Sequence, residues 1–149
     1  MSIIALITWI TAAAGGLYLV SIWLIEYDKE FQAAAATRLP PLVLVSHVTL
    51  ALGGLLVWVA YLILDSDNLA WMAVLALVLA ATLGGIMAIR WIGVYRETRA
   101  MKLQAAIDAR AIGVGPPERN FPLPVVIGHG VFAFATFALV LLTALGVGH

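Results

Sequence analysis

The sequence predicts an all-α fold, a bundle of four transmembrane helices, on two observations. Hydrophobic residues make up 64% of the 149 residues and charged residues only 11%, whereas soluble domains contain roughly 45–50% apolar and about 25% charged residues. Four stretches reach the length of about 20 mainly apolar residues that a membrane-spanning helix needs. They cover residues 3–25, 41–64, 69–92 and 123–146. Residues 1–149 are therefore expected to form a single integral membrane domain.

The first stretch is expected to remain in the protein as a helix rather than to be a cleaved signal peptide. No basic residue precedes it, and its apolar run continues well past residues 12–14, the one small-residue cleavage candidate. The third stretch is expected to be followed by a short amphipathic helix, because apolar residues recur at helical spacing between Ala100 and Ala111. That helix either extends the third stretch or lies on the membrane surface, and Gly113, Gly115 and Pro116–Pro117 end it.

Basic residues predict the orientation in the membrane, because Lys and Arg in short loops stay in the cytoplasm. They lie in the connections at 28–40 and 96–122, and Arg90 lies at the same end of the third stretch. The turn at 65–68 and both termini contain no Lys or Arg. Both connections are therefore expected to be cytoplasmic and both termini outside. The larger connection is interpreted either as a solvated basic loop or as a site for lipid or a partner.

Charge and composition also exclude several classes of function. Eight basic and eight acidic residues cancel, so no surface is expected for nucleic acid. The absence of cysteine removes disulfides, thiol catalysis, iron–sulfur clusters, zinc–thiolate sites and covalently attached c-type haem. No catalytic residue is identified, and the three histidines are the remaining soft metal ligands.

Two helical hairpins repeat one pattern, about residues 1–68 and 69–149. Three residues of the first helix have counterparts 68 positions later in the third, and two of the second have counterparts 82 positions later in the fourth. The pairs are Gly16 and Gly84, Trp23 and Trp91, Tyr27 and Tyr95, Pro40 and Pro122, and His47 and His129. Such parallel repeats are related by an axis along the membrane normal. The glycines and aromatic residues also fit close helix packing and the aromatic belt at a membrane boundary.

His47 and His129 are the residues most indicative of function. Each lies about five to seven residues inside the cytoplasmic end of its helix, roughly 8–10 Å deep. Small and hydroxyl-bearing residues, including Gly54 and Thr136, share their helix faces, and such faces point into a membrane bundle. The two imidazoles are therefore expected to converge as axial ligands of one b-type haem. Iron with both axial positions filled would transfer electrons rather than activate a substrate.

Other interpretations of these residues stay open. The histidines could form hydrogen bonds between helices, serve a proton, ion or quinone path, or bind another metal, although few other ligands are available for one. Arg90 lies at the histidine depth and would either bind a haem propionate or extend towards the cytoplasm. His149, the C-terminal residue, is expected to be incidental.

Two segments carry a resemblance to known proteins. Residues 118–148 and the segment Arg90–Tyr95 (Arg-Trp-Ile-Gly-Val-Tyr) resemble small four-helix membrane proteins of actinobacterial type. That resemblance covers most of the chain and implies a bacterial plasma membrane but no particular activity. More loosely, the chain is similar to the haem-bearing b-type cytochrome membrane subunits of respiratory enzymes, in which histidines from two helices hold a haem.

These observations predict a small membrane-bound b-type cytochrome, or a haem-bearing anchor subunit, that transfers electrons between the quinone pool and a partner. One haem per chain would be bound by His47 and His129, with Arg90, Gly54 and Thr136 nearby. The alternatives are a non-catalytic accessory or assembly subunit of a larger respiratory-type complex, with structural histidines, and a small transporter. The expected partners are membrane lipid and either a larger membrane complex or a second copy of the chain.

Overall fold

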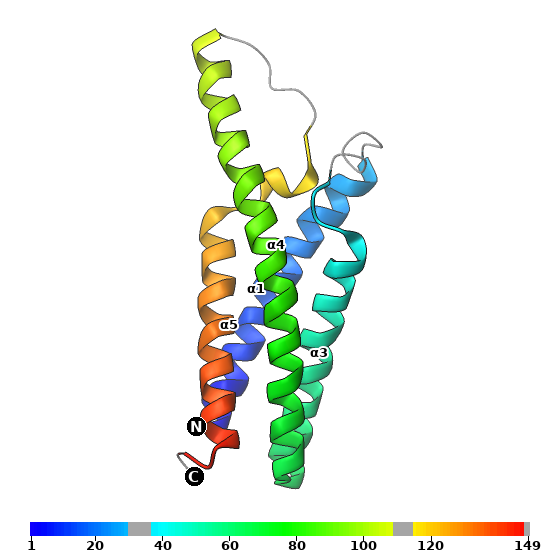
Figure 1. The fold of residues 1–149 in the computed structure, drawn as a ribbon, viewed down its shortest axis with the longest axis vertical. Helices are drawn as coiled ribbons and strands as arrows, with labels where there is room; N and C mark the ends of the chain where they lie inside the picture. The colour runs from blue at the N-terminus through cyan, green and yellow to red at the C-terminus, as the bar shows by residue number, and fades with distance from the viewer. Residues whose placement is uncertain (30–36, 109–114, 148–149) are drawn as a thin grey trace.

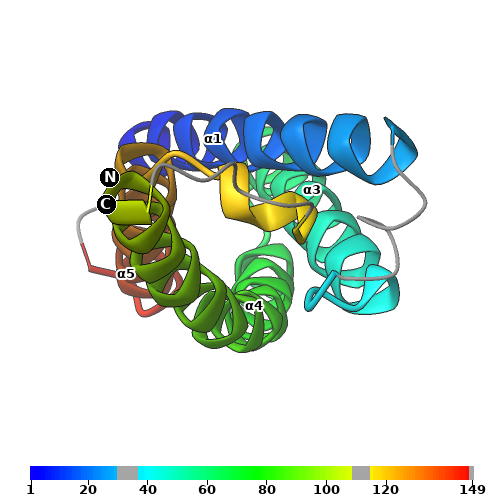
Figure 2. The ribbon, with the colours of Figure 1, turned by 90° about the horizontal axis from the view of Figure 1, so that it is seen from above.

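A computed structural model describes residues 1–29, 37–108 and 115–147. These residues form an all-α bundle, and its four α-helices are long and apolar enough to cross a membrane (Figures 1 and 2). The helices are α1 (Ser2–Lys29), α3 (Pro41–Leu64), α4 (Asp67–Asp108) and α5 (Leu123–Ala144), and a short 3-10 helix, η1 (Pro117–Asn120), precedes α5. The predicted class, a four-helix bundle with transmembrane-length helices, is confirmed.

Prolines determine where α3 and α5 begin. Pro40 and Pro122 occupy the positions just before the two helices, with extended backbone angles (φ −60° and ψ 125°, φ −68° and ψ 121°). Further prolines occupy the first turns, where a missing N–H costs no helical hydrogen bond. The predicted starts at residues 41 and 123 therefore match the structure.

A tight turn joins α3 to α4. Asp65 ends α3 in the left-handed region, with φ 49°, and its N–H donates to the carbonyl of Tyr61. Aspartate tolerates this conformation better than most residues. The turn lies at the same end of the bundle as both termini (Figure 1).

The third helix continues past the predicted membrane-spanning stretch, which agrees with one of the two alternatives expected for the amphipathic segment. α4 continues through residues 96–108 without interruption, so this part of the expected 96–122 connection is helical, and residues 28–29 likewise belong to α1. At about 1.5 Å per residue, α4 is about 63 Å long, roughly twice the ~30 Å hydrocarbon core of a bilayer. The amphipathic segment thus extends α4 as far as Asp108, and its expected end at Ala111 and Gly113 lies outside the described residues.

Helices from different halves of the chain make the main contacts. α3 packs chiefly against α4, and α1 against α5, while α1 and α3, or α4 and α5, contact each other less. The outer surface is strongly apolar: Leu42, Ile63 and Phe134 are each about three-quarters exposed (77%, 75% and 74%). Exposed apolar surface on this scale marks a membrane or partner contact rather than a water-facing surface.

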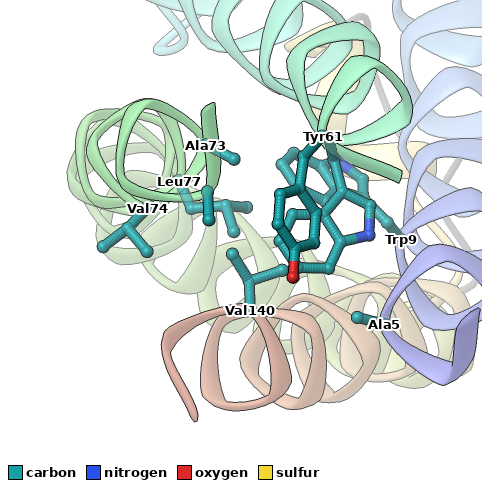
Figure 3. Close-up of a cluster of buried hydrophobic side chains, with 9 residues drawn as sticks. Ala5, Trp9, Tyr61, Ala73, Val74, Leu77 and Val140 are labelled. Carbon is teal, nitrogen blue, oxygen red and sulfur yellow. The ribbon is translucent and has the colours of Figure 1, made fainter. Parts of the chain in front are cut away.

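The largest buried cluster fills the end of the bundle that holds the termini. Trp9, Tyr61 and Val140 converge there on small and branched side chains of α4 (Figure 3). Trp58, fully buried in the same cluster, donates from its indole N–H to the carbonyl of Ser2 at 3.3 Å. Trp9 likewise donates to the carbonyl of Ala51 at 3.1 Å. Buried tryptophans generally need such a partner for the indole N–H. This end of the bundle is therefore well packed, and the indole N–H groups of Trp9 and Trp58 both have acceptors.

Candidate functional site

His47 of α3 and His129 of α5 meet inside the bundle. Their ring centroids are 6.2 Å apart, and the ring planes are inclined by 73°. α3 and α5 lie diagonally opposite each other in the end-on view (Figure 2), so the imidazoles reach towards each other across the interior. The predicted convergence of the two rings is confirmed.

Each imidazole is held by one backbone carbonyl of a neighbouring helix. His47 Nδ1 lies 2.8 Å from the carbonyl oxygen of Ala80 in α4, and His129 Nδ1 lies 2.8 Å from that of Ala12 in α1. A carbonyl oxygen can only accept, so each Nδ1 carries the proton and donates it. Each Nε2 is then left with its lone pair, and neither has a hydrogen-bond partner among the described residues.

Two glycines make room for the rings. A Cβ atom added to Gly16 would lie 2.9 Å from Cε1 of His129, and one added to Gly84 would lie 3.1 Å from Cε1 of His47. Each glycine follows its hydrogen-bonding alanine by four residues, one turn along the same helix face. Each imidazole therefore lies close to the backbone of its neighbouring helix, and a Cβ would displace the ring more at Gly16 than at Gly84.

The sequence analysis did not identify Ala12 and Ala80, whose carbonyl oxygens contact the two histidines. The two alanines are 68 residues apart, the same offset that relates Gly16 to Gly84. A search for further pairs at this offset would have found them. Gly16 and Gly84 were interpreted as helix-packing residues, whereas the structure places histidine rings against them.

A cavity of about 420 Å³ lies between the four helices and includes both histidines. This volume falls within the range of roughly 300–1,000 Å³ that is usual for sites binding small molecules and cofactors. Apart from the imidazoles the lining is almost entirely apolar, with Gly16, Gly84, Trp91 and Phe121 among its residues. Such a cavity suits a largely apolar ligand with an atom that imidazole can bind.

The remaining predicted site residues occupy different positions. Thr136 lines the cavity, and its hydroxyl donates to the carbonyl of Phe132 at 2.8 Å. Gly54 does not line it: a Cβ there would lie 2.9 Å from Cβ of Ala76 and 3.0 Å from the ring of Trp9. Gly54 shares the helix face of His47 but lies about two turns away, so it serves close packing with α4 and α1 instead.

Arg90 also lies outside the cavity. Its side chain is exposed, and Nη1 donates to the carbonyl of Arg38 at 3.2 Å. This arrangement matches the outward extension that its flanking position on the helix favours. His149 lies outside the described residues.

Glu118 is a buried carboxylate at one end of the bundle, and the sequence analysis did not identify it. Glu118 of η1 is fully buried. One carboxylate oxygen accepts the backbone N–H of Arg38 at 2.6 Å, and the other accepts the Thr37 hydroxyl at 3.0 Å. η1 lies across this end of the bundle, over α1 and α4 (Figure 2). The sequence shows Glu118 only as a loop charge, because the N–H of Arg38 and the hydroxyl of Thr37 that bind it are far away in the chain.

Arg38, whose backbone N–H binds Glu118 of η1, also contacts α4 through its side chain. Its guanidinium forms an ion pair with Glu97 at 2.7 Å, with both side chains about half exposed. The hydrogen bond to Glu97 raises the pKa of Arg38 above its usual value. Arg38 thus contacts Glu118 through its N–H, Arg90 through its carbonyl and Glu97 through its side chain.

Within residues 1–29, 37–108 and 115–147, no group of three or more His, Cys, Asp or Glu side chains could hold a metal ion. Any metal bound by the two imidazoles would need its other ligands from a cofactor or solvent. Comparisons of the chain with models of protein families, with curated proteins and with solved structures find no match.

Proposed function

We propose that the protein is a small membrane-bound b-type cytochrome that transfers electrons between the quinone pool and a partner. One haem per chain would be held between His47 and His129. The observation that carries the proposal is the pair of imidazoles, 6.2 Å apart at one cavity, each with Nδ1 bound to a carbonyl.

The ring separation fits two axial ligands of one metal ion. Metal–imidazole bonds are about 2 Å long, and a ring nitrogen lies about 1 Å from its centroid, so two rings that held one metal ion between them would have centroids about 6 Å apart. The inclination of 73° between the rings is compatible with this arrangement, because rotation about a metal–nitrogen bond leaves the bond intact.

The donor set favours haem over a bare ion. Two imidazoles are too few ligands for a protein metal site, which commonly has four or more, whereas a porphyrin brings four nitrogens of its own. The carbonyls of Ala12 and Ala80 would orient the rings and keep each Nε2 available, the usual role of a hydrogen bond to the far nitrogen of a ligating histidine. The apolar helices would exclude water. A haem held by His47 and His129 would supply one-electron transfer.

A second candidate, an accessory or assembly subunit with structural histidines, is favoured by the same two hydrogen bonds. They tie α3 to α4 and α5 to α1 and would stabilise the bundle without any cofactor. The two candidates differ in what the purified protein should contain.

A visible spectrum separates them. Purified from a haem-replete host, the protein should give the reduced-minus-oxidised spectrum of a six-coordinate, low-spin b haem. His47→Ala and His129→Ala should each convert or abolish that spectrum, while His149→Ala, which removes the third imidazole of the chain, should not. A colourless protein with normal helicity that takes up no haem on reconstitution would refute the cytochrome and favour the accessory subunit.

We also propose that the chain consists of two repeated hairpins in a bacterial plasma membrane, with both termini outside. The contacts of His129 with Ala12 and Gly16, and those of His47 with Ala80 and Gly84, support the repeat. Because the chain has no cysteine, single cysteines can test the orientation. A cysteine at Ser66 should react with an impermeant reagent added to intact cells, and one at Ala106 should not. The opposite pattern would reverse the topology.

A further inference from the structure

A second hollow lies on the outer surface of α4, where α5 begins. It has a volume of about 530 Å³ and is open to the outside. Its apolar wall includes Trp91, Ile92, Leu103 and Leu123, and Arg96 and Arg99 also line it. We call it the α4–α5 groove. Trp91 is the residue that it shares with the histidine cavity.

The two arginines of the groove are uncompensated. Both are exposed, and their spacing of three residues places them on one side of α4. Arg38 has an ion pair with Glu97, and Arg90 has a hydrogen bond to a carbonyl. In contrast, neither Arg96 nor Arg99 has a hydrogen bond or ion pair with any residue in the described ranges. Two free guanidinium groups beside each other therefore offer a site for an anion.

The lining of the groove changes from apolar to cationic side chains along α4 between Trp91 and Arg99. Trp91 and Ile92 belong to the end of the apolar stretch, and Leu123 is the first residue of α5. Trp91 is paired with Tyr95, with ring centroids 5.3 Å apart, and such aromatic residues are typical of the boundary between hydrocarbon and headgroups. The arginines follow at the next turns. The apolar wall formed by Trp91, Ile92 and Leu123 thus continues directly into the two arginines, and Leu103 lies about one turn beyond them.

We propose that the α4–α5 groove binds one anionic phospholipid of the surrounding bilayer. Its phosphate would lie between Arg96 and Arg99, and an acyl chain would follow Trp91, Ile92 and Leu123. Arginine is well suited to phosphate, which it can bind through two parallel N–H donors. Basic pockets beside transmembrane helices are known to bind anionic headgroups. This proposal does not depend on haem, because the groove excludes both histidines.

Native mass spectrometry of the detergent-purified full chain tests the proposal. Phosphatidylglycerol and phosphatidylcholine with identical acyl chains are added separately, and retained lipid is counted. The wild type should retain one phosphatidylglycerol and roughly tenfold less phosphatidylcholine. The double variant Arg96→Gln/Arg99→Gln should retain roughly tenfold less phosphatidylglycerol than the wild type. Lys102→Gln, which removes an exposed charge that does not line the groove, should retain it.

Three outcomes would overturn the proposal. If the double variant retained as much phosphatidylglycerol as the wild type, the arginines would not be the binding groups. If the wild type retained as much phosphatidylcholine as phosphatidylglycerol, the groove would not recognise the anionic headgroup. Loss of lipid from Lys102→Gln as well would show that net charge, not the groove, controls retention. Excess inorganic phosphate serves as a further arm: it should not displace the lipid, and displacement would indicate a simple anion site. Circular dichroism of each variant should show unchanged helicity, because both arginines are exposed.

Discussion

The two ends of the bundle differ in how their interior is filled. Where the termini lie, large side chains such as Trp9, Trp58 and Tyr61 fill the interior. Further along the helices, glycines and alanines stand among larger apolar residues, and a cavity of about 420 Å³ with two histidines takes the place of a packed core. The first region is closely packed, whereas the second holds a cavity lined by the two histidines.

Two glycines show the difference at atomic scale. A Cβ at Gly54, in the packed region, or at Gly16, beside the cavity, would come within 2.9 Å of another atom. At Gly54 that atom is Cβ of Ala76, which is fixed to the backbone. At Gly16 it is Cε1 of His129, the end of a ring that can turn into open space. The same steric conflict should therefore reduce stability in one region and displace a histidine ring in the other.

The largest loss of stability is expected from Trp58→Ala. Removal of a fully buried tryptophan typically lowers the free energy of unfolding by about 3–5 kcal/mol. Thermal unfolding in detergent should show a much lower midpoint. Trp71→Ala is the matched control, because Trp71 on α4 is 47% exposed and should have little effect. Equal losses from the two variants would mean that the packed end does not dominate stability.

A smaller loss is expected from Gly54→Ala. The added methyl group would meet both Ala76 and the ring of Trp9, and overpacking of this kind typically costs about 1–3 kcal/mol. Gly53→Ala is the control on the adjacent residue, where a Cβ has no neighbour within 4 Å; it should leave stability unchanged or slightly raised, since alanine favours helix. If both variants unfold alike, α3 can move away from α4 and the packed region is looser than proposed.

Gly16→Ala should affect haem binding more than stability, in contrast to Gly54→Ala. Its stability loss should be smaller than that of Gly54→Ala, because the imidazole can rotate away. That rotation would break the 2.8 Å hydrogen bond of His129 to Ala12 and misplace Nε2, so haem occupancy should fall or the low-spin spectrum should change. Gly84→Ala should act in the same way but more weakly, since the contact there is 3.1 Å. Gly128→Ala, at a position where a Cβ has no neighbour within 4 Å and which does not line the cavity, should bind haem normally, and a similar defect in that variant would contradict the steric explanation.

The sequence predicted the histidine pair because polar side chains are rare in apolar helices. His47 and His129 stood out by residue type, and the prolines before them fixed the helix starts at residues 41 and 123. The continuation of α4 through residue 108 was left open between two possibilities, because periodicity alone cannot distinguish an extended helix from a separate one at the membrane surface. Glu118 was missed because its burial depends on hydrogen bonds to residues about 80 positions away, which no local pattern reveals.

The smallest effect is expected from Arg90→Leu, at the boundary of the cavity region. Arg90 is exposed, bonds to the carbonyl of Arg38, and does not line the cavity. A guanidinium bound to a propionate would hold a charge-assisted hydrogen bond near the iron, and its removal would shift the midpoint potential. An arginine directed away from the cavity has no such contact, so a redox titration should give the wild-type potential and haem content. A clear shift in Arg90→Leu, absent from the charge-conserving Arg90→Lys, would mean that haem draws this side chain from the Arg38 carbonyl into the site. Arg90 would then belong with the histidines rather than with the outer surface of the bundle.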